Sequence, residues 1–317
     1  MKKVLVTIFI IGIVLLVIGG IIMTTQHEGV ELSNNKDFDF HLNFNLDKII
    51  NKMKNINFNN KVFDENNFKD VNDFKFDTIK KEFEKTDDIS VESSIYSTFI
   101  QKDSSLSKIS VEVTRPIVED KDEYIFEVEF NNSLDKLIIK QTYDYKDNIF
   151  NKYQKLFNKC KIIIKVPDNF EIGDVDINCS VGSININEIN AKNVEIKGGV
   201  SSINLNDIEA TSIELETGVG SLNAKNVLSK KFEFVSGVGS IDFEGNIEDL
   251  FNIDLGTGSA KIYLPEKEKN YNYDLDSGIG SVKINGLKHK DKAKINNEVS
   301  KNIVVETGTG SISIFTK

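Results

Sequence analysis

The fold is decided by one stretch, Gly218-Val219-Gly220-Ser221-Leu222, which returns with small changes through the second half of the chain. Anchored on the serine, seven copies occur, and the steps between them are 19, 19, 19, 19, 22 and 30 residues. Self-similarity at a fixed period indicates a repeat architecture in which each unit packs against its neighbours. The serines are Ser183, Ser202, Ser221, Ser240, Ser259, Ser281 and Ser311.

Each copy alternates apolar and polar residues directly after the serine, as in Leu222, Asn223 and Ala224. This alternation is typical of a half-buried β-strand. A second apolar pair, such as Ile213 and Leu215, lies near the middle of the unit, so each copy predicts two short strands. A unit this small cannot bury its own apolar face, and stacking the copies into a β-solenoid solves the problem.

The Gly-x-Gly before five of the seven serines predicts a corner where positive φ is needed and where a Cβ atom would clash. The serines should stack at this corner, with hydroxyls that satisfy backbone groups of the turn. The glycines are Gly218, Gly237, Gly256, Gly278 and Gly308 at the first position and Gly220, Gly239, Gly258, Gly280 and Gly310 at the second.

The repeat frame extends towards the N-terminus. The segment from Lys161 to Pro167 leads to Gly182 as the segment from Ser259 to Pro265 leads to Gly280, which predicts a first coil of 22 residues from about Lys161. The polar stretch from Leu287 to Ser300 predicts a surface loop. Alternating segments between Asp88 and Lys155 predict strands that form an N-terminal cap or early irregular coils.

The expected fold class is therefore all-β. We expect a single-stranded-coil β-solenoid of about seven to eight coils, with an irregular β N-terminal cap and one N-terminal transmembrane helix. The expected domains are a cytoplasmic tip and transmembrane anchor at 1–25, an Asn/Phe-rich spacer at 26–87, and the solenoid at 88–317. Within the solenoid, residues 88–160 are the expected cap strands and 161–317 the repeat coils.

Val4 to Met23 form an uncharged run of 20 residues that follows Lys2 and Lys3. Its length matches the hydrocarbon thickness of a bilayer. Because basic residues stay in the cytoplasm, we expect a single-pass protein of the cell membrane, with the N-terminus cytoplasmic and the C-terminal domain extracytoplasmic. A cleaved signal peptide is the alternative, although the first alanine in the chain, Ala191, is too late for an Ala-x-Ala cleavage site.

No pattern of catalytic or metal-binding residues appears in the sequence. The histidines are His27, His41 and His289, and none has Cys, Asp or Glu at a metal-ligand spacing. Cys160 and Cys179 either form a disulfide, which an extracytoplasmic location permits, or remain two buried thiols. We expect no enzyme activity, no catalytic, cofactor-binding or metal-binding residues, and no cofactor.

Two further site types are disfavoured. The Gly-x-Gly copies lack the third glycine of a nucleotide-binding loop and precede strands rather than helices, so they predict corners. Acidic residues such as Asp242, Asp254, Asp274 and Asp276 occur outside any calcium-binding nonapeptide, which predicts a solvated face. The net charge of −10 argues against nucleic acid as a partner.

The repeated Gly-x-Gly-Ser corner, the Ile-Lys-Val-Pro at Ile164 and the Ile-Tyr-Leu-Pro at Ile262 resemble the bacterial "putative adhesin" family of β-strand-repeat proteins, domain of unknown function 4097. The resemblance covers roughly 88–317 and includes the strands around Ile89 to Val113. It implies an envelope or surface β-solenoid, and some relatives are associated with envelope-stress regulation. It implies no catalytic or ligand-binding residues.

These features predict a membrane-anchored extracytoplasmic β-solenoid that acts as a non-enzymatic cell-surface binding or adhesin-like module. The alternative is a regulatory or sensing partner in cell-envelope stress signalling that acts through another membrane protein. The expected partner is an envelope or surface polymer, or another membrane protein. The last coil, ending at Phe315-Thr316-Lys317, has no evident cap, which predicts end-to-end homodimers.

Overall fold

A computed structural model describes residues 74–118, 125–133, 135–141, 154–168 and 170–317. The chain divides into two compact units, and every described residue lies in the second, Glu65–Lys317. The predicted membrane span at 4–23 and most of the predicted spacer lie outside the described residues. Within the described ranges, no helix combines the length and apolarity that crossing a bilayer requires.

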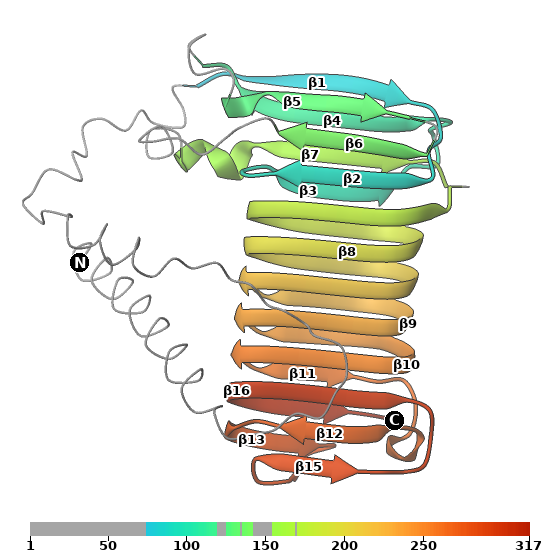
Figure 1. The fold of residues 1–317 in the computed structure, drawn as a ribbon, viewed down its shortest axis with the longest axis vertical. Helices are drawn as coiled ribbons and strands as arrows, with labels where there is room; N and C mark the ends of the chain where they lie inside the picture. Colours follow the sequence, from blue (N-terminus) through green and yellow to red (C-terminus); the bar gives the residue numbers. More distant parts are fainter. Residues whose placement is uncertain (1–73, 119–124, 134, 142–153, 169) are drawn as a thin grey trace, which may run out of the picture. The chain divides into compact units, whose positions relative to one another are not determined.

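The described chain is all-β, and no α-helix occurs in the ranges given above. Its strands belong to one hydrogen-bonded sheet system that stacks in a single column (Figure 1). The elements are β1 (Phe76–Phe83), β2 (Asp88–Ser93), β3 (Ser97–Lys102), β4 (Ile109–Pro116), β5 (Val128–Asn132), β6 (Lys136–Gln141), η4 (Gln154–Lys159), β7 (Lys161–Val166), β8 (Ile172–Val219), β9 (Leu222–Val238), β10 (Ile241–Thr257), β11 (Ala260–Tyr263), η5 (Glu268–Asn270), β12 (Asn272–Asp276), β13 (Ile279–Ile284), β14 (Leu287–Lys288), β15 (Lys292–Ile295) and β16 (Asn302–Phe315).

The central coils repeat as the sequence period predicts. Ile203 pairs in parallel with Leu222, and Leu222 with Ile241, so that neighbouring coils are offset by one repeat. These residues belong to the first sheet, formed by the half-coils that follow each serine. Phe232 and Phe251 pair in the same way in the second sheet, formed by the other half-coils. The two strands predicted for each copy are therefore confirmed.

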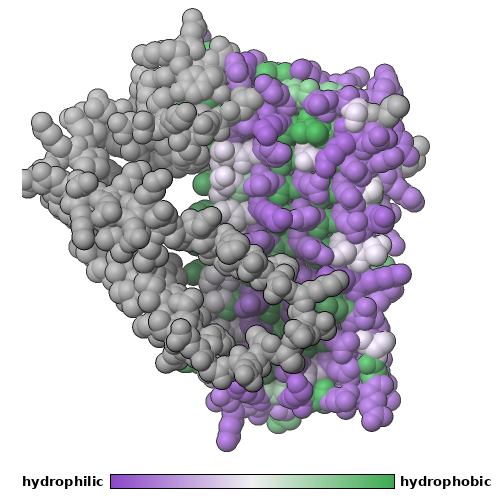
Figure 2. Space-filling model, viewed as in Figure 1, coloured by the Kyte–Doolittle hydropathy of each residue, from purple (hydrophilic) through white to green (hydrophobic). Residues whose placement is uncertain are grey.

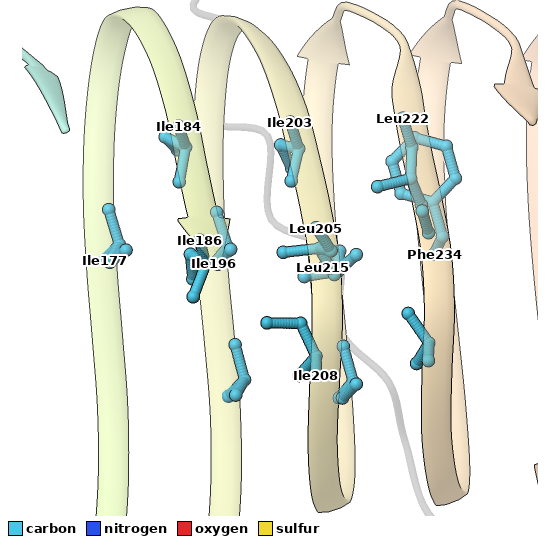
Figure 3. Close-up of a cluster of buried hydrophobic side chains, with 14 of the residues drawn as sticks. Ile177, Ile184, Ile186, Ile196, Ile203, Leu205, Ile208, Leu215, Leu222 and Phe234 are labelled. Atoms are coloured by element: carbon cyan, nitrogen blue, oxygen red, sulfur yellow. The ribbon is translucent and has the colours of Figure 1, made fainter. Parts of the chain in front are cut away.

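The core lies between the two sheets and consists of the side chains predicted to point inward. Ile184, Ile203 and Leu222 lie at the same place in successive coils and are almost fully buried (Figure 3). Further along the stack, the rings of Phe232 and Phe251 are stacked with centroids 5.3 Å apart, and Phe243 is 4.7 Å from Phe251. Ladders of identical or similar side chains thus provide the hydrophobic stabilisation.

The C-terminal strand does not form the last coil, which corrects the sequence-based expectation. β16 lies between two other coils, and Figure 1 shows it in red between β11 and the β12–β13 coil. On one side it pairs in parallel with β10 and β11, and on the other with β12 and β13. The ladder from Ile253 therefore continues to Val305 and only then to Leu275.

At the N-terminal end, too, the order of the coils along the stack differs from their order in the sequence. β2 and β3 form a coil between β8 on one side and β6 and β7 on the other. The expectation that the segment from Lys161 to Gly182 forms one continuous coil is wrong, because β3 lies between β7 and β8 in the first sheet. Thr98 pairs with both Ile162 and Ile184.

Both 22-residue steps occur where the chain passes over a coil that another segment occupies. From Ile162 to Ile184 it passes over β3, and from Ala260 to Val282 it passes over the second half of β16. Neighbouring strands are about 4.8 Å apart, so these steps advance about 9.6 Å. The three residues in excess of 19, in the connections after Pro167 and Pro265, supply the additional length.

Antiparallel strands terminate both ends of the stack. At the C-terminal end, β15 pairs with β12 and β14 pairs with β13, so the predicted surface loop from Leu287 to Ser300 contains two cap strands. At the other end, β1 pairs with β4, and β5 pairs with β6. β1 lies within the stretch predicted as spacer. Antiparallel caps of this kind limit the parallel edges on which further coils would grow.

Candidate functional site

The glycine-serine corner is structural. An added Cβ on Gly239 would lie 1.7 Å from the carbonyl oxygen of Gly220, so close stacking of the coils excludes any side chain there. The φ angle at Gly220 is 156°, a backbone conformation that L side chains rarely adopt, and Gly258 and Gly310 have similar values. The predicted positive φ and the predicted Cβ clash are therefore both found at this corner position. The corner closes on a neighbouring coil and leaves no space for a phosphate group.

The serines form the predicted ladder along this corner. The amide of Ser240 donates to Oγ of Ser221 at 3.3 Å, and the amide of Ser259 donates to Oγ of Ser240 at 3.2 Å. The amide of Ser311 donates to Oγ of Ser259 at 3.2 Å, which independently places β16 next to the coil of Ser259. These hydroxyls accept hydrogen bonds from backbone amides of the neighbouring coil, which accounts for the serines structurally.

The two cysteines are free thiols, which settles the alternative left open by the sequence. The β2–β3 coil lies between them, and the carbonyl oxygen of Tyr96, at its corner, accepts from Sγ of Cys179 at 3.4 Å. Two coils correspond to about 9.6 Å, which exceeds the span of a disulfide. Burial raises the pKa of Cys160 to about 12 and also raises the pKa of Cys179, so neither thiol is activated as a nucleophile.

The histidines do not form a site in the described residues. His289 lies in the connection between β14 and β15, where its backbone amide donates to the carbonyl oxygen of Val282 at 2.9 Å. His27 and His41 lie outside the described residues. Across the described ranges, no group of three or more His, Cys, Asp or Glu side chains has the arrangement of a metal site.

A row of carboxylates lies on the outer side of the second sheet near the C-terminal cap. Asp254 pairs with Glu306, and Glu306 with Asp276, so three like charges lie on adjacent strands. Partial desolvation raises the pKa of Asp254, and desolvation together with the neighbouring carboxylates raises the pKa of Glu306. The Lys292 ammonium donates to Asp276 at 2.6 Å and lowers the pKa of that carboxyl. Lys292 of the C-terminal cap therefore neutralises the charge at the Asp276 end of this row, and the Asp254 end has no such partner among the described residues.

A shallow groove of about 520 Å³ is the candidate binding site. It runs along the side of the stack where each coil turns from the first sheet to the second. Its floor is made of small residues at the repeat spacing, Ala191, Ala210 and Ser229. Ala210 and Ser229 are paired on neighbouring strands, which confirms that the floor follows the axis. The hydroxyl of Ser229 donates within the protein, to the carbonyl oxygen of Lys231 at 2.7 Å.

Longer side chains form the two edges of this groove. One edge carries Glu171, Asn190, Glu209 and Leu228. The other carries Lys192, Thr211, Lys230 and, in the coil where Ile247 pairs with Ser229, Glu248. The chain turns just before the first edge, at residues whose backbone is in the left-handed region, with φ of 55° at Glu188 and 56° at Asp207. The sequence-based expectations did not include this groove. The alternation of small and long side chains at a 19-residue period is the signal that would have identified it.

The remaining surface is mostly hydrophilic. Figure 2 shows hydrophilic side chains over most of the described surface in that view, with narrow hydrophobic strips between them. The first sheet carries asparagines at the repeat spacing, and Nδ2 of Asn204 donates to Oδ1 of Asn185 at 3.0 Å. The surface seen in this view is thus mostly solvated, and the groove is a concave feature of the described coils.

Comparison with known proteins gives a family match. A family model described as Toastrack DUF4097 matches residues 86–249, just over half of the chain. No curated protein matches the sequence.

Solved structures give further likenesses. A "putative adhesin" from Bacteroides fragilis NCTC 9343 is 17% identical with a TM-score of 0.42, over 76% of this chain and 97% of that one. A "putative cell adhesion protein" from Clostridium sporogenes ATCC 15579 is 15% identical with a TM-score of 0.36, over 77% and 100%. A "putative lipid binding protein" from Parabacteroides distasonis ATCC 8503 is 14% identical with a TM-score of 0.35, over 76% and 96%. Identities and TM-scores this low assign no ligand.

Proposed function

Because the chain belongs to the Toastrack DUF4097 family, we propose that it is a non-enzymatic binding module held at the outer surface of a cell membrane. The groove on the side of the stack carries this proposal. It extends over several coils, with small floor residues at the coil spacing, so it suits an elongated ligand rather than a small molecule.

The membrane location rests on the sequence of the N-terminal segment. The uncharged run from Val4 to Met23 is long enough to span a bilayer, and Lys2 and Lys3 favour a cytoplasmic N-terminus. In this orientation the solenoid faces the cell exterior, and an envelope or surface polymer can reach the groove. The protein needs no catalytic group for this role, because the coils supply a rigid surface on which a polymer can lie.

The test uses the full-length protein in lipid nanodiscs, immobilised and exposed in turn to purified wall polymers, membrane-linked glycans and extracellular matrix proteins. We expect at least one polymer to be retained above the level of empty nanodiscs and recovered with its chain length unchanged. Retention of none of them would contradict a binding role, and a shortened polymer would contradict a non-enzymatic one.

A further inference from the structure

The groove contains charged side chains of both signs that have no ion-pair partner in the described part of the chain. Glu171, Lys192, Glu209 and Lys230 all line it, and none makes a salt bridge or side-chain hydrogen bond there. Elsewhere on the coils, lysines and carboxylates do pair, as Lys231 does with Glu233 at 2.9 Å. The groove charges are therefore available to a ligand that carries charges of both signs.

These charges form two separate rows. Glu171 and Glu209 lie on one edge, two coils apart, and Lys192 and Lys230 lie on the opposite edge, also two coils apart. Glu248 follows Lys230 on that opposite edge, so the lysine row ends there. With neighbouring strands about 4.8 Å apart, each row repeats at about 9.6 Å along the axis. The floor between the rows is uncharged, with Ile172 at its first position and the small Ala191, Ala210 and Ser229 after it. A complementary ligand from Glu171 to Lys230 therefore has three sides, one anionic, one cationic and one uncharged.

A polyproline II helix has this geometry. It has three residues per turn and a rise of about 3.1 Å per residue, so each of its three rows of side chains repeats at about 9.3 Å. A β-strand places successive side chains on two opposite faces at about 6.7 Å intervals, and an α-helix repeats at about 5.4 Å. Neither matches two charged rows at about 9.6 Å on either side of a floor.

We propose that this groove binds a polyproline II peptide segment that carries one lysine or arginine and one carboxylate residue in each turn. The basic row of the peptide contacts Glu171 and Glu209, its acidic row contacts Lys192 and Lys230, and its third row lies on Ala191 and its equivalents. The inference rests on the proposed binding function and names the ligand class. Because polyproline II is pre-ordered, binding loses less conformational entropy than it would with a flexible chain.

The test uses fluorescein-labelled peptides and the full-length protein in nanodiscs, with binding followed by fluorescence anisotropy. The probe has four Pro-Lys-Glu repeats, and the comparison peptides have four repeats of Pro-Gln-Gln, Pro-Lys-Lys or Pro-Glu-Glu. We expect the Pro-Lys-Glu peptide to bind at least ten-fold more tightly than the other three, with an affinity that falls as salt is added.

The matched variants change one edge at a time. Lys192→Glu with Lys230→Glu makes both edges acidic, so the preference should switch from the Pro-Lys-Glu peptide to the Pro-Lys-Lys peptide. The control, Lys225→Glu with Lys283→Glu, makes the same charge change at exposed positions on the first sheet and should leave the preference unchanged. Circular dichroism of each variant verifies that the fold is retained.

Equal affinity for Pro-Lys-Glu and Pro-Gln-Gln, or an equal response of the groove and control variants, would overturn the proposal. The two assays together distinguish a wrong ligand class from a wrong binding function. If the nanodisc assay retains a glycan or a wall polymer but no peptide discriminates, the binding role stands and the ligand class is wrong. If neither assay detects binding, both are wrong.

Discussion

At the corner of each coil, Gly220 and Ser221 meet two different packing requirements. Glycine allows the backbones of neighbouring coils to approach, since an added Cβ at Gly220 would lie 1.7 Å from the carbonyl oxygen of Ser201. Serine supplies an acceptor for the next coil, because Oγ of Ser221 accepts from the amide of Ser240. The repeated motif therefore encodes close approach and hydrogen bonding together, and neither needs a ligand.

A substitution at this corner should be strongly destabilising. We expect Gly239→Ala to lower the free energy of unfolding by about 3 kcal/mol or more, because the clash is with backbone that cannot move aside. Gly286→Ala is the control, since its Cβ would meet nothing within 4 Å and only its left-handed φ of 83° is unfavourable, at about 1 kcal/mol. Urea unfolding followed by circular dichroism measures both, and equal losses would contradict the clash.

The buried thiol of Cys160 should make stability depend on alkaline pH. Its pKa rises from 9.0 to about 12 on folding, so between these values the folded state keeps a proton that the unfolded state has lost. The contribution is complete below pH 9.0 and is lost as the pH rises towards 12. The slope from this group is at most about 1.4 kcal/mol per pH unit.

Urea unfolding at pH 8, 9 and 10 for the wild type and for Cys160→Ala isolates this effect, because other groups titrate equally in both proteins. The stability of the wild type should fall more steeply with pH than that of the variant. Parallel pH profiles would mean that the Cys160 thiol is accessible to solvent in the folded state.

At the scale of elements, the chain order and the spatial order of the coils differ at both ends. At the N-terminal end, β6 and β7 belong to the outermost coil, and β2 and β3 form the next coil towards the middle of the stack. At the C-terminal end, β12 and β13 form the outermost coil, and β16 is its neighbour towards the middle. The chain leaves the outer coil of β7 through the longer connection after Pro167 and enters the outer coil of β12 through the one after Pro265. Each end of the stack thus has an inner strand hydrogen-bonded on both edges and an outer coil with an antiparallel cap.

Hydrogen-deuterium exchange should reveal this order directly. The amides of β16 pair with strands on both sides, so we expect them to exchange as slowly as those of β10. The amides of β14 and of the outer edge of β15 should exchange fastest among the strands of this end. Rapid exchange throughout β16, comparable with that of β14, would indicate that it is a terminal coil.

Much of this fold was predictable from the sequence because the period fixes local structure. Residues such as Ile203, Leu205, Ile213 and Leu215 are buried where the alternation predicted, and the stacking of the serines is confirmed. The position of β16 was not predictable, because its Gly-Thr-Gly-Ser corner suits any coil equally well. Self-similar strands leave the choice of neighbour to long-range pairing, which periodicity does not encode.

The groove was missed for a different reason. Ala191, Ala210 and Ser229 show no chemistry when read singly, and their significance depends on the longer side chains beside them. Only the stacked arrangement places Glu209 and Lys192 on opposite edges of a common floor. Motif searches look for reactive groups at short spacing, whereas this site is formed by residues one and two coils apart.

At the scale of the whole molecule, a single column of coils presents its groove along one side, and the predicted anchor lies at the N-terminus of the sequence. The proposed binding function requires this column to face outward. The alternative role in envelope-stress signalling stays a prediction, as does the end-to-end dimer. For the dimer, the coil ending at Phe315 cannot supply the free edge, because β16 is paired on both sides.

Protease treatment of intact cells tests the orientation. We expect cleavage N-terminal to β1 and release of one resistant fragment that contains β1 to β16, identified by mass spectrometry. Cells opened before treatment serve as the control for protease activity. If intact cells protect the entire chain while opened cells do not, the solenoid faces the cytoplasm, and the proposed surface role is wrong.

The double pairing of β16 also has a mechanical consequence. A stack of parallel coils in chain order would peel apart under load one coil at a time, starting from a free terminal strand. Tension applied to β16 instead acts on a strand held along both edges, so the ladders to β10 and to β12 must rupture together. In a force-extension experiment, the C-terminal end should therefore yield in one abrupt step rather than in a sawtooth of small ones, a property suited to a tether that carries load.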